Sequence, residues 1–91
     1  NYRNAEFAKD ALSKVSGVEV KRSSPTFNEF TVLLPKPAGE VVYRMIEKGF
    51  APGFPLGKFY KGMDNYLLVA VTEKRTKEEI QKFSDSLEAV L

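Results

Sequence analysis

Apolar residues near the start of the chain recur with the spacing of one face of a helix. Within residues 3–15 they are Ala5, Ala8, Leu12 and Val15. This period predicts an amphipathic helix, and Gly17 follows where a helix C-cap is expected. A second run with the same period, which Gly49 ends, contains Ala38, Val41, Val42, Met45 and Ile46. Pro37 suits the first turn of that helix, because the N–H that proline lacks would have no partner there.

A third helical pattern begins at Thr76. Glu79 follows at the spacing of a capping box, in which each side chain bonds the backbone N–H of the other residue. The apolar stripe of this pattern contains Ile80, Phe83, Leu87 and Val90. The sequence therefore predicts three helices, each with one apolar face.

Three stretches between these helices have the patterns of β-strands. Residues 18–21 form the first, and a turn that contains Pro25 is expected at 22–26. In 28–34 the apolar residues Phe30, Val32 and Leu34 alternate with the residues between them. Residues 65–72 are apolar on both faces, which is typical of an interior strand.

The order of these elements indicates an α+β fold with a small antiparallel or mixed sheet and three helices on one face. We expect residues 1–91 to form a single domain, because a chain of this length builds one modest core. The sheet face that the helices leave bare would carry Thr31, Leu33, Leu68 and Ala70. A contiguous apolar patch usually marks an interface, so we expect another domain or subunit to cover it. Two alternatives stay open: a slightly apolar surface, or a register shifted by one residue, which exchanges the faces.

The segment 50–62 combines four aromatic residues with three glycines and two prolines. The glycines permit positive φ and the prolines stiffen the path. The residues expected to fix this segment to the core are Phe54, Leu56, Phe59 and Tyr60. Composition favours a packed crossover, and the alternative is a rigid loop beside a binding cleft. The residues expected to face a cleft or an interface are Asn28, Leu33, Gly53, Phe54, Leu56, Gly57, Leu68 and Ala70.

Composition limits the chemistry of the chain. Its 91 residues contain no His and no Cys, which removes disulfides, thiolate chemistry and the commonest general base. We therefore expect no catalytic, cofactor-binding or metal-ligating residues. The net charge of +2 comes from dispersed Lys and Arg residues, so neither a nucleic acid nor a membrane is the expected partner. The absence of Cys fits a cytoplasmic chain, and a start inside a helical pattern indicates a piece of a longer one.

Four blocks of this sequence occur in the same order in one family. They are FNEF (27–30), LPKP (34–37), the loop with Gly49, Gly53, Leu56 and Gly57, and LLVAVTEKRTKEEI (67–80). Through these blocks the chain resembles the C-terminal small domain of glycine dehydrogenase (decarboxylating), the P-protein of the glycine cleavage system. The form that it resembles is the separate subunit 1 of the two-subunit bacterial type.

The resemblance implies a fold like that of the C-terminal domain of aminotransferase-fold (type I) pyridoxal-phosphate enzymes. The parent enzyme would decarboxylate glycine on pyridoxal phosphate and pass the aminomethyl group to the lipoyl arm of the H-protein. Its Schiff-base lysine would belong to the other subunit and to a large domain, so this chain would not hold the cofactor. The implied partners are the large domain of the parent chain, a second P-protein subunit and the lipoylated H-protein. The bare sheet face and the segment 50–62 would then be contact surfaces.

A second class of function stays open from the residues alone. The order of elements also permits a free-standing ferredoxin-like module that binds a small molecule or dimerises through its bare sheet face. Nucleic-acid binding is not expected, because that face would lack the stacking aromatic side chains that such binding uses.

Overall fold

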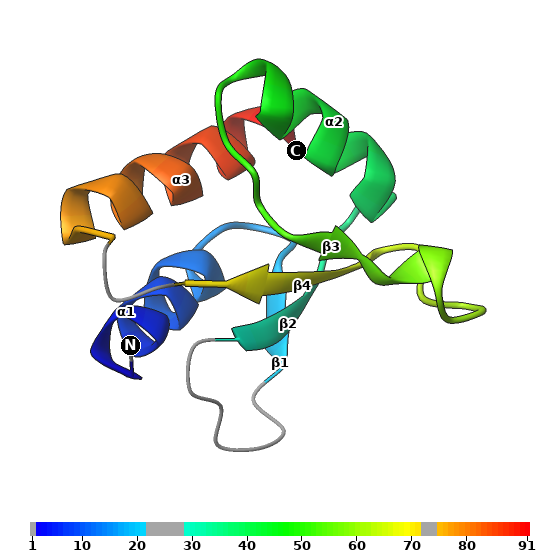
Figure 1. Ribbon diagram of the computed structural model, residues 1–91, viewed down its shortest axis with the longest axis horizontal. Coiled ribbons are helices and arrows are strands. Elements are labelled where there is room, and N and C mark those ends of the chain that lie inside the picture. The colour runs from blue at the N-terminus through cyan, green and yellow to red at the C-terminus, as the bar shows by residue number, and fades with distance from the viewer. Residues whose placement is uncertain (1, 22–28, 72–74) are drawn as a thin grey trace.

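The computed structural model describes residues 2–21, 29–71 and 75–91. The turn predicted at 22–26 and the candidate residue Asn28 lie outside these ranges. Helices and strands follow one another along the chain in the order drawn in Figure 1. They are α1 (Tyr2–Ser13), β1 (Glu19–Lys21), β2 (Glu29–Leu33), α2 (Ala38–Glu47), β3 (Phe54–Pro55), the 3-10 turn η1 (Leu56–Lys58), β4 (Tyr66–Ala70) and α3 (Lys77–Val90).

The strands form one four-stranded antiparallel sheet with the order β1-β2-β4-β3. Strand β4 lies between β2 and β3, which confirms the prediction of an interior strand. The sequence pattern did not predict β3, because a strand of two residues has no period to recognise. Its place beside β4 makes β1 and β3 the two edges of the sheet.

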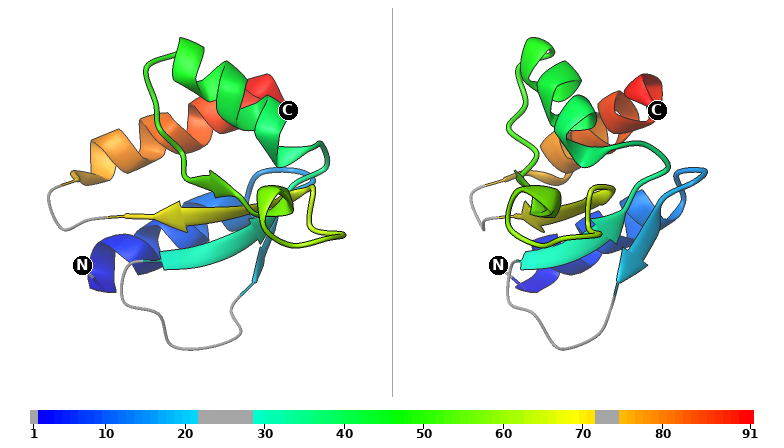
Figure 2. Two further views of the ribbon diagram at one scale, coloured as in Figure 1. Left: turned by 45° about the vertical axis from the view of Figure 1, so that its right-hand side comes forward. Right: turned by 90° about the vertical axis from the view of Figure 1, so that its right-hand side faces the viewer.

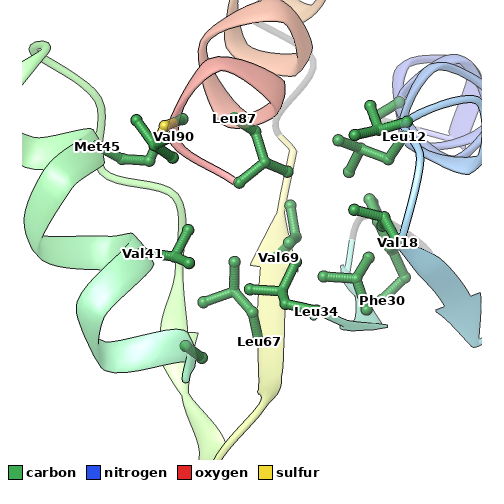
Figure 3. Close-up of a cluster of buried hydrophobic side chains, with 14 of the residues drawn as sticks. Leu12, Val18, Phe30, Leu34, Val41, Met45, Leu67, Val69, Leu87 and Val90 are labelled. Carbon is green, nitrogen blue, oxygen red and sulfur yellow. The ribbon is translucent and has the colours of Figure 1, made fainter. Parts of the chain in front are cut away.

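The three helices pack on one face of the sheet and enclose the core (Figures 2 and 3). The strands contribute the alternate residues that face the helices, among them Val32 of β2 and Leu67 of β4, both fully buried. Buried side chains that Figure 3 shows between the layers are Leu12, Phe30, Leu34, Val41, Met45, Val69, Leu87 and Val90. The α+β fold with its helices on one face is therefore confirmed.

Helix α2 departs from its predicted stripe at one residue. Val41 and Met45 are buried, but the side chain of Ile46 is 58% exposed. Five positions on a helix cover a wider arc than the sheet and α3 can bury, so the residue at the edge of that arc faces solvent. Pro37 is the N-cap of α2 and lies one position before its first turn.

Helix α3 begins with the predicted capping box. The side-chain oxygen of Thr76 accepts a hydrogen bond from the backbone N–H of Glu79 (3.1 Å). The Glu79 carboxylate in turn accepts one from the backbone N–H of Thr76 (2.8 Å). Further along, the buried Ser84 hydroxyl donates to the carbonyl oxygen of Ala11, 3.4 Å away, which joins α3 to α1. None of the described helices has the length and apolar character needed to cross a membrane.

Candidate functional site

The side of the sheet opposite the helices carries an apolar surface, which we call the open sheet face. Strand register defines its members: Thr31 lies opposite Leu68, Leu33 opposite Tyr66, and Phe54 opposite Leu68. Residues paired in this way point to the same side of an antiparallel sheet. The open sheet face therefore includes Thr31, Leu33, Phe54, Tyr66, Leu68 and Ala70, and by the same rule Glu19, Lys21 and Glu29 point to this side and form its charged border.

The members of the open sheet face are all accessible to some degree. Phe54 is 61% exposed and Ala70 is exposed, whereas Thr31, Leu33, Tyr66 and Leu68 are half-buried. Their neighbours along β4, Leu67 and Val69, point to the core instead. The pattern confirms the predicted register, because a shift by one residue would have placed Leu68 beneath the helices.

Charged residues border this surface at one side. Lys21 of β1 donates a hydrogen bond to Glu19, with 3.0 Å between the ammonium nitrogen and the carboxylate oxygen. The Glu19 carboxylate thereby raises the pKa of the Lys21 ammonium group above its usual value. Glu29, opposite Ala70, is exposed as well. The open sheet face is thus an apolar centre with a polar rim, the arrangement common in protein interfaces.

Two aromatic residues on the open sheet face contradict one expectation. Phe54 and Tyr66 both lie there, so the prediction that this face lacks aromatic side chains is wrong. Tyr66 could have been placed from sequence, because it precedes Leu68 by two positions in the same strand. The carboxylates of Glu19 and Glu29 at the rim would repel a polyanion such as a nucleic acid.

Gly53 leads the chain into β3 at a position that excludes a side chain. Its φ is +144°, and a Cβ at this position would overlap the carbonyl oxygen of Leu68 and lie 3.3 Å from Cα of Val69. Glycine alone allows this close approach of two backbones. Gly53 therefore sets Phe54 in register with Leu68 on the open sheet face.

The way the segment 50–62 is fixed differs from the prediction. The prolines Pro52 and Pro55 are buried, whereas Phe54, Phe59 and Tyr60 are 61%, 67% and 57% exposed. The alternation of β3 explains the positions of Phe54 and Pro55, because Pro55 pairs with Leu67 on the core side and Phe54 with Leu68 on the other side. Apart from half-buried Leu56, the residues expected to fix this segment to the core therefore point away from it.

The turn that follows β3 is tightly closed. A Cβ at Gly57 would lie 2.8 Å from Cα of Asp64, so only glycine fits between the two arms of the turn. Backbone N–H groups of Phe59 and Tyr60 donate to the carbonyl oxygen of Leu56 at 3.0 and 2.9 Å. Phe59 in turn contacts Phe54 edge-on, with ring centroids 6.4 Å apart. The turn thus continues the aromatic surface past the end of the sheet.

The structure brings most of the predicted interface residues together. Leu33, Phe54, Leu68 and Ala70 share the open sheet face, and Gly53 supports it from β3. Leu56 and Gly57 lie in η1 at one end of the face. The surface offers hydrocarbon, aromatic rings and the hydroxyls of Thr31 and Tyr66, which suits contact rather than proton transfer. Within residues 2–21, 29–71 and 75–91, no three His, Cys, Asp or Glu side chains gather as metal ligands would.

The sequence of this chain was compared with protein-family models and with curated proteins. No protein-family model matches it. Over all 91 residues it is 52% identical to the probable glycine dehydrogenase (decarboxylating) subunit 1 of Geotalea uraniireducens. The chain matches a segment of glycine dehydrogenase (decarboxylating) subunit 1. It covers 21% of the Geotalea uraniireducens protein, so it spans about a fifth of the length of the curated relatives that it matches.

The solved structures that resemble this chain also include a glycine decarboxylase. The crystal structure of glycine decarboxylase (P-protein) of the glycine cleavage system, in inhibitor-bound form, has a TM-score of 0.87 and 30% identity. That alignment covers 99% of this chain and 20% of the solved chain. L-Threonine-O-3-phosphate decarboxylase from Porphyromonas gingivalis follows with a TM-score of 0.79 and 26% identity, over 97% of this chain and 26% of that one. The expected likeness to aminotransferase-fold enzymes and the resemblance to glycine dehydrogenase subunit 1 are both confirmed.

Proposed function

We propose that this chain acts as the C-terminal small domain of a glycine dehydrogenase (decarboxylating) subunit 1 and contributes an interface rather than catalytic groups. The parent enzyme would decarboxylate glycine and transfer the aminomethyl group to a lipoyl group. The match along the whole chain to about a fifth of a glycine dehydrogenase subunit carries this proposal. The open sheet face supports it, because an uncovered apolar sheet surface is what a domain shows when the neighbour that covers it is absent.

Pyridoxal phosphate is the cofactor that we assign to the parent enzyme. It needs a lysine for a Schiff base and partners for its phosphate and ring nitrogen. The open sheet face does not fit this group: among its described members and rim, the only ammonium belongs to Lys21, which bonds Glu19. The buried Lys9 is paired with Glu6 at 3.0 Å and packs over Phe30 on the helix side. The cofactor would therefore be held by the rest of the parent enzyme.

The partners follow from the same surface. The remainder of the parent chain would cover the open sheet face, because a covalently attached domain pays little translational entropy for the contact. A second P-protein subunit and the lipoylated H-protein would complete the assembly, and we place the enzyme in the cytoplasm.

A chimaera tests the proposal directly. The segment of Geotalea uraniireducens subunit 1 that matches this chain is replaced by residues 1–91, and the chimaera is combined with the second subunit, cofactor and H-protein. Release of carbon dioxide from carboxyl-labelled glycine is then measured. We expect the chimaera to turn over glycine and the isolated chain to be inactive under the same conditions.

Two results would contradict the proposal. Turnover by the isolated chain would show that it carries catalytic groups of its own. A chimaera that is folded by circular dichroism and assembled with its partner, yet inactive, would show that these residues do not serve as that domain. The unmodified subunit is the positive control for both arms.

A further inference from the structure

Strand β4 extends beyond the short strand β3 that pairs with it. Strand β3 pairs with Leu67 and Leu68, whereas β4 continues to Ala70. Pro52 would be the partner of Ala70 if β3 continued, but proline has no N–H for a ladder. In Figure 1 the chain between α2 and β3 instead runs away from β4 toward α2. One side of β4 is therefore uncovered at Ala70.

The backbone groups of Ala70 point to this uncovered side. The carbonyl of Leu68 points toward β3, because a Cβ at Gly53 would overlap its oxygen. Hydrogen-bonding direction alternates along a strand, so Ala70, two positions further, points the same way. Within residues 2–21, 29–71 and 75–91, no backbone hydrogen bond joins Ala70 to a residue outside the sheet. Ala70 is exposed, so its N–H and C=O are available to a further strand.

A hollow lies beside Ala70, between α3 and the segment that leads into β3. We call it the edge hollow, and its volume is about 380 Å³. Phe50 and Phe83 give it an aromatic wall, because both are half-buried and their ring centroids are 6.0 Å apart. Arg75, Lys82 and Glu79 also line it. Two cations against one carboxylate leave the edge hollow with a net positive charge.

The pleat of the sheet determines which side chains a further strand would present here. A residue opposite Ala70 would point to the open sheet face. The residues before and after it would point to the helix side, where the edge hollow lies. Phe50 and Phe83 suit an apolar side chain, and the cations suit an acidic one. The matching strand would therefore carry an apolar and an acidic residue two positions apart.

We propose that an extended segment of the parent chain, outside residues 1–91, pairs with β4 at Ala70 and fills the edge hollow. One donor and one acceptor are too few to hold a separate protein, whereas a segment of the same chain loses little translational entropy. The 91 residues cover 21% of the matched subunit, so most of that subunit lies outside them. Ala70 belongs to the open sheet face and also lines the edge hollow, so one neighbour can cover both.

This inference rests on the proposed function, because it needs the parent chain as the source of the segment. The two can nevertheless fail separately. Glycine turnover tests the proposed function, whereas hydrogen exchange and cross-linking test the segment in the assembled chimaera whether or not it is active. An inactive chimaera with a paired Ala70 would count against the proposed function alone.

Hydrogen exchange tests the backbone pairing. Exchange of the Ala70 N–H is measured by mass spectrometry, with fragmentation to single residues, in the isolated chain and in the assembled chimaera. Val69 is the internal reference, because its backbone groups point the other way, toward Phe30 of β2. We expect Ala70 to exchange at least about tenfold more slowly in the chimaera, with Val69 protected in both.

Photo-cross-linking identifies the occupant. The photoreactive residue p-benzoylphenylalanine replaces Ala51, an exposed residue of the edge hollow, in the assembled chimaera. In the matched control it replaces Tyr43, which is exposed on α2. Mass spectrometry then identifies the cross-linked peptide. We expect position 51, but not position 43, to join a parent-chain segment outside residues 1–91 with an apolar and an acidic residue two positions apart.

Charge reversal tests the contribution of the cations. Lys82→Glu should lower the yield of this cross-link about threefold or more, because an acidic residue of the segment would then meet a carboxylate. Lys48→Glu is the matched control, since Lys48 is an exposed lysine that does not line the edge hollow. It should leave the yield unchanged.

Three results would overturn the inference. The first is an Ala70 N–H that exchanges equally fast in the isolated chain and in the assembled chimaera. The second is a cross-link from position 51 to the second subunit or the H-protein, which would assign the edge hollow to a separate protein. The third is a set of cross-links confined to residues 1–91, which would show that no segment covers the edge hollow.

Discussion

Gly53 shows how much a single residue can decide in this fold. An added Cβ would overlap the carbonyl oxygen of Leu68, and φ is +144°. We expect Gly53→Ala to lower the free energy of unfolding by about 1–3 kcal/mol or more, the usual cost of a strained backbone conformation. Urea denaturation followed by circular dichroism measures this loss.

Gly39 is the matched control for this substitution. It lies in α2, and nothing is within 4 Å of the place that its Cβ would occupy. Gly39→Ala should therefore stabilise the chain by about 0.5–1 kcal/mol, because alanine is the better helix former. Equal effects of both substitutions would refute the steric argument at Gly53.

Some single residues behave in ways that sequence patterns do not reveal. Lys9 is 4% exposed, and its ammonium lies over the Phe30 ring and donates a hydrogen bond to Glu6. Ser84 is 2% exposed because its hydroxyl bonds a carbonyl of α1. Both residue types are usually found at the surface. Their burial depends on the packing of α1 against its neighbours, which residue type alone does not encode.

At the scale of the elements, the capping box of α3 can be tested on its own. Thr76→Ala removes the acceptor for the backbone N–H of Glu79 and should cost about 1 kcal/mol of stability. Thermal unfolding of the wild type and the variant, at neutral pH, measures the difference. Ser13→Ala is the control, because the exposed Ser13 hydroxyl donates to the Asp10 carbonyl at the C-terminal end of α1 instead of capping a helix N-terminus. Equal unfolding temperatures for both variants would show that the cap contributes nothing.

The same cap makes the stability of α3 depend on pH. The backbone N–H of Thr76 bonds the Glu79 carboxylate and, with help from Arg75, holds its pKa below the usual value of 4.5. A lowered folded-state pKa means that the contribution is complete above the unfolded-state pKa. It is lost as the pH falls through the folded-state pKa.

We therefore expect the unfolding free energy of Glu79→Gln to change less with pH in the acidic range than that of the wild type. The difference in unfolding free energy between wild type and variant should be largest near neutral pH and should shrink as the pH falls through the folded-state pKa of Glu79. Urea denaturation at several pH values measures it. A difference that stays constant over this range would contradict the assigned role of the carboxylate.

The elements that the sequence predicted are those with a period or a cap. The alternation of Phe30 and Val32 and the spacing from Thr76 to Glu79 are local patterns, and the structure confirms both. Strand β3 was missed, and with it the pairing that places Phe54 opposite Leu68, because two residues with a proline give no pattern. Its pairing with β4 depends on Gly53 and Leu68, which are far apart in sequence. Sequence reasoning thus found most of the open sheet face but mistook how the segment 50–62 is held.

At the scale of the whole molecule, two neighbouring leucines of β4 lie on opposite faces of the sheet, one in the core and one on the surface that we expect to contact a partner. Leu67 is fully buried among the helices, whereas Leu68 lies on the open sheet face. In the isolated chain, Leu67→Ala should cost about 2–5 kcal/mol of stability, because it leaves a cavity. Leu68→Ser should cost about 1 kcal/mol or less. Urea denaturation of both variants checks this order, and a reversed order would contradict the assignment of the two faces.

In the chimaera with Geotalea uraniireducens subunit 1, we expect the open sheet face to affect the activity and stability of the enzyme. Leu68→Ser should then lower glycine turnover or the thermal stability of the assembled enzyme, because the residue would lie in a domain contact. Tyr43→Ser is the control, since Tyr43 is 66% exposed on α2, away from the open sheet face. If both variants behave like the unsubstituted chimaera, the open sheet face is not a contact in the enzyme.

The edges of the sheet have a further consequence. Strand β1 has three residues, with Glu19 paired to Lys21, and β3 has two, of which Pro55 has no N–H to offer. A strand from another molecule could form few backbone hydrogen bonds with either edge of the sheet. The two edges of this sheet therefore offer little template for the edge-to-edge pairing through which β-proteins aggregate.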